Sequence, residues 1–72
     1  MLPDGTYDVI VVDAARHSTS ALGLEVVILA GDQKGQVVSV RADGLGIDEL
    51  AALGLPGTLT VAAGEPSLVL EQ

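Results

Sequence analysis

The amino-acid sequence predicts a single small all-β domain with one short helix, covering residues 1–72. Two observations lead to this class. Glycine and proline divide the chain into five apolar segments, and most of these alternate with period two, as strands do. Only the stretch after the third segment has helical spacing instead. The predicted order of elements is therefore β-β-β-α-β-β.

The first strand is expected at residues 6–15, after Pro3-Asp4-Gly5. It is rich in β-branched residues, which favour extended backbone. The run from Val9 to Val12 places apolar side chains on both sides of the strand. We therefore expect this strand to be buried on both faces or strongly bent. The polar segment 16–20 that follows is expected to be a loop.

The second and third strands are expected at residues 21–30 and 36–42, joined by a hairpin loop with Gly31 and Gly35 at its ends. Alternation predicts which side chains face the core: Leu22, Leu24, Val26, Ile28, Val38 and Val40. The opposite, outward side carries another set: Gly23, Glu25, Val27, Leu29, Val37, Ser39 and Arg41.

A short helix is expected over residues 47–53, with an apolar side made by Ile47, Leu50, Ala51 and Gly54. Asp48 and Glu49 are expected in its first turn, where the helix dipole favours negative charge. Gly54 suits the left-handed position after the last turn. Two further strands are expected at residues 58–62 and 67–71, separated by a turn.

One helix between the third and fourth of five strands is typical of the OB-fold, a five-stranded Greek-key barrel. An SH3-like barrel is the alternative, and it usually lacks a helix of this length at this point. Residues 5–14 and the hairpin that follows residues 24–30 also resemble small phage and actinobacterial proteins of the OB type. The resemblance covers residues 5–42 and implies an OB-fold, and some proteins of that group are associated with binding single-stranded DNA.

Composition limits the possible functions. The chain has no cysteine and only one histidine, which argues against disulfides and metal sites. Its net charge of −7 repels nucleic acid and anionic lipid, and Tyr7 is its only aromatic residue. No apolar run is long enough to span a membrane and no secretory signal is evident. No catalytic pair is recognisable, so we expect a small acidic cytoplasmic protein that is not an enzyme and uses no cofactor.

Two groups of residues are candidates for binding. Val27, Leu29, Val37 and Ser39 lie on the outward side of the second and third strands, where exposed aliphatic side chains suggest a protein partner or a homodimer contact. The alternatives are scattered surface residues or cover by the chain ends. The second group is a possible ligand loop, in which antiparallel pairing would bring Arg41 near Arg16 and His17, with Lys34 as the remaining basic residue.

This loop and the same face could together bind single-stranded nucleic acid, which is the alternative function. The simpler interpretation of these basic residues is that they balance neighbouring carboxylates.

Overall fold

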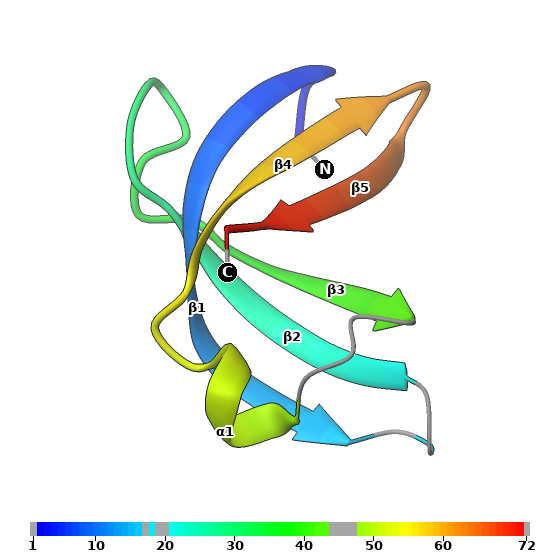
Figure 1. The fold of residues 1–72 in the computed structure, drawn as a ribbon. Coiled ribbons are helices and arrows are strands. Elements are labelled where there is room, and N and C mark those ends of the chain that lie inside the picture. Colours follow the sequence, from blue (N-terminus) through cyan, green and yellow to red (C-terminus); the bar gives the residue numbers. More distant parts are fainter. Residues whose placement is uncertain (1, 17, 19–20, 44–47, 72) are drawn as a thin grey trace.

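The computed structural model describes residues 2–16, 18, 21–43 and 48–71, and contains five strands and one short helix in the predicted order (Figure 1). The elements are β1 (Gly5–Arg16), β2 (Ala21–Ile28), β3 (Val37–Asp43), α1 (Glu49–Ala52), β4 (Pro56–Ala62) and β5 (Glu65–Leu70). The predicted all-β class with one helix is confirmed.

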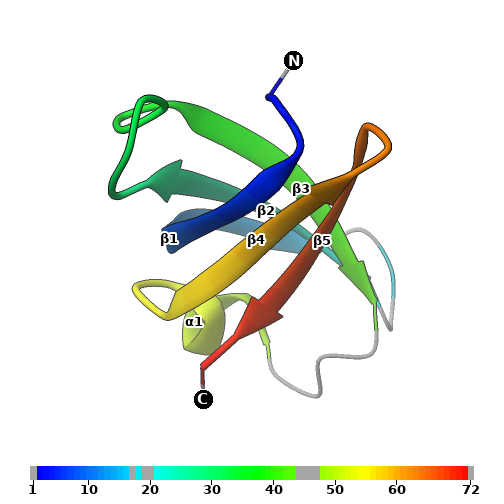
Figure 2. The same cartoon turned by 90° about the horizontal axis from the view of Figure 1, so that it is seen from above.

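The strands form one sheet in the order β3-β2-β1-β4-β5, and all of its neighbouring strands are antiparallel. The sheet curls into a half-barrel whose two edge strands, β3 and β5, turn toward each other (Figure 2). An apolar hollow of about 180 Å³ lies here, lined by Leu2, Val38, Val61, Gly64 and Pro66. The helix follows β3 and contacts β1, at the point in the chain expected for an OB-like barrel.

The core fills the concave side of the sheet and, among the described residues, contains no buried polar side chain. Its centre is a set of fully buried aliphatic residues: Val9, Val11, Leu24, Val26, Ile28 and Leu59. The cross-strand pairs Leu24–Val40 and Val26–Val38 confirm the inward side predicted for β2 and β3. Because apolar burial is the main stabilising term in such a fold, these side chains are expected to contribute strongly to its stability.

A β-bulge between Val11 and Asp13 explains why β1 has apolar residues of both parities. Before the bulge, Val9 and Val11 are buried; after it, Ala14 packs against the core. Val12 and Asp13 are both exposed between these inward positions. The extra residue shifts the alternation by one and bends the strand, so the expected strong bend is confirmed.

The helix is shorter than predicted, and the side that was predicted to be buried is exposed. Leu50 is 76% exposed, whereas Ala52 is completely buried. A single turn that starts at residue 49 is too short for the expected period to develop. Asp48 is the N-cap rather than a first-turn residue, because its carboxylate accepts a hydrogen bond from the Ala51 N–H at 2.7 Å.

The end of the helix agrees better with expectation. Gly54 adopts a left-handed φ of 81°, and Ile47 lies outside the described residues.

No helix among the described residues is long and apolar enough to cross a membrane.

The strands of the β4–β5 hairpin extend closer to the turn than predicted, so the turn contains only Ala63 and Gly64. Both residues have positive φ, 54° and 79° respectively, as a type I′ turn requires. The Asp4 carboxylate accepts hydrogen bonds from both turn N–H groups, at 3.0 Å from Ala63 and 3.3 Å from Gly64. A segment near the amino terminus thereby holds the far hairpin in place.

Leu24→Ala should lower the free energy of unfolding by about 2–5 kcal/mol, because it removes a side chain that is only 1% exposed from the core. Leu50→Ala, at the exposed helix position, is the matched control and should change stability by less than about 0.5 kcal/mol. Urea denaturation followed by circular dichroism measures both. Equal effects would contradict the assignment of the core.

Ala63→Asn should raise the free energy of unfolding by about 1 kcal/mol, because Asn tolerates the left-handed backbone that costs Ala roughly this amount. Thermal denaturation compares the variant with the parent protein. A loss of stability would mean that the turn does not have two positive φ angles.

Candidate functional site

The convex face of the sheet carries a continuous row of apolar side chains across four strands. Val37 pairs with Val27, Val27 pairs with Ile10, and Ile10 pairs with Pro56. We call these four residues the outer row. Val27 and Ile10 are half-buried, while Val37 and Pro56 are exposed. Directly paired side chains on one face of a sheet are in contact distance, so the outer row forms one surface.

Two further aliphatic residues flank the outer row. Leu29 is 44% exposed and Val12 is 50% exposed, compared with 55% for Val37 in the row itself. Although β2 ends at Ile28, the Leu29 N–H still donates to the Asp8 carbonyl at 2.8 Å. This hydrogen bond keeps Leu29 beside β1, on the same side of the sheet as Val27. The apolar surface is therefore wider than the outer row alone.

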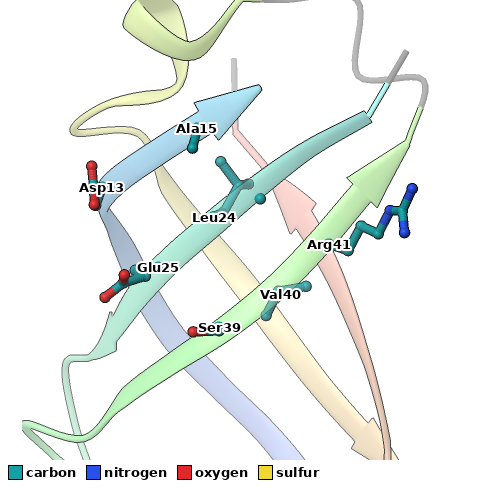
Figure 3. A pocket seen from close by; sticks show the side chains of 8 residues that line it. Asp13, Ala15, Leu24, Glu25, Ser39, Val40 and Arg41 are labelled. Carbon is teal, nitrogen blue, oxygen red and sulfur yellow. The ribbon is translucent and has the colours of Figure 1, made fainter. Parts of the chain in front are cut away.

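Beside the outer row lies an open hollow of about 350 Å³ on β1, β2 and β3 (Figure 3). It is lined by Asp13, Ala15, Gly23, Leu24, Glu25, Ser39, Val40 and Arg41. Gly23 stands between Ala15 and Arg41 in the cross-strand register. Because glycine has no side chain, the sheet surface is low at this point.

The charges on this face are mostly negative. Asp8 lies in the register position next to the outer row on one side, and the cross-strand pair Asp13–Glu25 lies on the other. Two carboxylates directly opposite each other repel. Arg41 is the cation of the hollow, but its side chain extends away from Asp13 and Glu25 (Figure 3). Among the described residues, the ion pair that forms joins Arg16 and Glu49 instead.

The structure brings together the residues predicted for the partner or dimer face. Val27 and Val37 are direct neighbours, and Ser39 pairs with Glu25 in the adjacent row. Leu29 comes just after the end of β2 and lies on the same side of the sheet as Val27. Sequence reasoning missed Ile10 and Pro56, which complete the outer row. The sequence offered a signal for Ile10, because an even-numbered residue of the first strand lies on the side opposite to Val9 and Val11.

The described residues of the predicted ligand loop lie on different parts of the sheet. Arg16 pairs with Leu22, on the inward parity, and its Nε lies 3.1 Å from the Glu49 Oε2 of α1. Arg41 pairs with Gly23 and therefore lies on the outer face. Lys34 is in the β2–β3 loop, and His17 is outside the described residues. The bulge therefore places Arg16 and Arg41 on opposite faces of the sheet, and the cluster expected with His17 stays a prediction.

Neither a metal site among the described residues nor a matching protein indicates what this face binds. No group of three or more His, Cys, Asp or Glu side chains able to hold a metal ion occurs within the described part of the chain. No protein-family model, curated protein or solved structure matches this chain. The outer row and the charged groups beside it are therefore the features that bear on function.

A single-stranded oligonucleotide should bind more weakly than about 100 μM at roughly 150 mM salt, because the net charge of −7 opposes approach and few cations can replace the counterions. Fluorescence anisotropy with a labelled oligomer measures this affinity. Micromolar binding that is lost in the Arg41→Glu variant would contradict the expectation.

Proposed function

We propose that this protein is a small non-enzymatic binding module that docks a protein, either a foreign partner or a second copy, on its outer face. The observation that carries the proposal is the outer row, with Leu29 and Val12 beside it. Contiguous exposed aliphatic side chains on a sheet are typical of interaction surfaces. Here Val12, Leu29 and Val37 each leave about half of their surface in solvent, at 50%, 44% and 55%.

The energetics are consistent with a contact of modest strength. Complete burial of one aliphatic side chain contributes about 1.5–3 kcal/mol before the cost of association. The face residues are already partly covered, so each contributes only part of this amount. Association itself costs several kcal/mol in lost freedom. Several of these side chains must therefore be buried together, which requires a partner that covers the row and its flanks.

Nucleic-acid binding through the same face is the weaker alternative. Proteins that bind single strands place aromatic rings where bases can stack, and each ring contributes about 1–3 kcal/mol. Tyr7, the only aromatic residue, packs against the core cluster from the concave side. The face itself has aliphatic side chains and carboxylates at the corresponding positions. These features favour a protein ligand.

Leu29→Lys should preserve the fold, because the residue lies beyond the end of β2 and is 44% exposed. It should abolish any concentration-dependent self-association seen by sedimentation, and any protein retained from cell extract by the immobilised parent protein. The matched control is Leu50→Lys on α1, at an exposed leucine away from this face. It should leave both measurements unchanged.

Two results would contradict the proposal. One is unfolding of the Leu29→Lys variant, shown by circular dichroism, because the residue would then belong to the core. The other is a parent protein that stays monomeric at about 1 mM, a concentration that detects even weak dimers, and that retains no protein in a Leu29-dependent way.

A further inference from the structure

The chemistry of the face allows the occupant to be narrowed. We infer that the outer row binds a positively charged, amphipathic segment of a partner protein, in which a stripe of apolar side chains is flanked by lysine or arginine. This inference rests on the proposed function, because it concerns the same face. Its basis is the order in which apolar and acidic residues follow one another across the sheet.

The geometry of the face sets the pattern required of the partner. Neighbouring strands are about 4.8 Å apart, so the outer row from Val37 to Pro56 spans roughly 14 Å. The adjacent outward positions on each strand are two residues away, or about 7 Å. Asp8 occupies such a position on one side of Ile10, and Glu25 occupies one on the other side of Val27. Apolar groups in the centre and cations on both sides would match this arrangement.

The carboxylates of this face are available for a partner. Asp8 and Glu25 are exposed and form no ion pair with any described residue. Asp13 already has one partner within the protein, because its carboxylate accepts a hydrogen bond from the Ala14 N–H at 2.9 Å. A cation placed between Asp13 and Glu25 would relieve the repulsion of this cross-strand pair. The hollow beside Gly23 provides space for a long lysine or arginine side chain there, because Arg41, the cation that lines the hollow, extends away from Asp13 and Glu25.

A second copy fits the same face poorly. In a two-fold dimer the same patch meets itself, so Asp8, Asp13 and Glu25 of both copies would be brought into one interface. Each copy also carries a net charge of −7. Like charges opposed across an interface suppress association. Charge complementarity therefore favours a basic partner over self-association.

The test uses fluorescence anisotropy with labelled peptides of about 14 residues, made of leucine and lysine. One peptide has leucines at helical spacing and one has alternating leucines, because either arrangement forms an apolar stripe. We expect at least one to bind the parent protein, with an affinity that falls as salt rises. The same peptides with glutamate in place of lysine should not bind. A shuffled peptide of equal charge without a stripe should bind much more weakly.

Matched protein variants separate the face from net charge. Asp8→Asn/Glu25→Gln removes two carboxylates of the face, and Glu65→Gln/Glu71→Gln removes two exposed carboxylates at the ends of β5. Both variants lose the same amount of charge. The face variant should weaken binding roughly five- to tenfold, and the β5 variant less than about twofold. Val37→Ser should also weaken binding, and circular dichroism confirms that each variant is folded.

Three results would overturn the inference. Equal loss of affinity in the two double variants would mean that only net charge attracts the peptide. Binding of the glutamate peptides would mean that the acidic groups do not select the partner. Failure of every lysine peptide to bind would reject a basic partner. If the last result accompanied self-association that Leu29→Lys abolishes, the proposed function would stand and its occupant would be a second copy.

Discussion

The single-residue bulge in β1 is the constraint on which the rest of this fold depends. β1 pairs with β2 along most of its length and with β4 along its first half, so it joins the two halves of the sheet. Inward-facing residues have odd numbers before the bulge and even numbers after it, and the bulge increases the local twist. At the same point the Val11 N–H donates to the Leu55 carbonyl at 3.0 Å, and the Val11 carbonyl accepts from the Gly54 N–H at 2.9 Å. The chain leaving α1 is thereby attached where β1 bends.

The local pattern was enough to predict most of the fold. Strict alternation in β2 and β3 identified Leu24, Val26 and Val40 as inward residues, since a register error would have placed them in water. The bulge in β1 has no equally clear local signal, because a run of β-branched residues fits several registers. The prediction of the buried side of the helix failed for a related reason. One turn capped by Asp48 buries only Ala52, so the spacing of Leu50 did not indicate a buried side.

The residues of the candidate site also divide into those that local pattern predicts and those that it does not. Val27 and Val37 were predicted together because a short hairpin sets their register locally. Ile10 and Pro56 join them only through pairings between segments far apart in the chain, which the sequence pattern does not specify. The face on which Arg16 lies has the same origin, since it depends on a bulge several residues earlier. Long-range register, more than residue type, limited what could be inferred about function.

The incomplete closure of the barrel has a consequence for solubility. Both ends of the sheet, β3 and β5, are edge strands, and such edges can pair with other chains and start aggregation. β5 is protected by Pro66, which lacks an N–H group, and by Glu65 beside it. β3 has no proline, and Arg41 is the charged side chain near its middle. Mutual repulsion between acidic molecules therefore adds to the protection of β3, and neutralising the carboxylates in acid would remove that contribution.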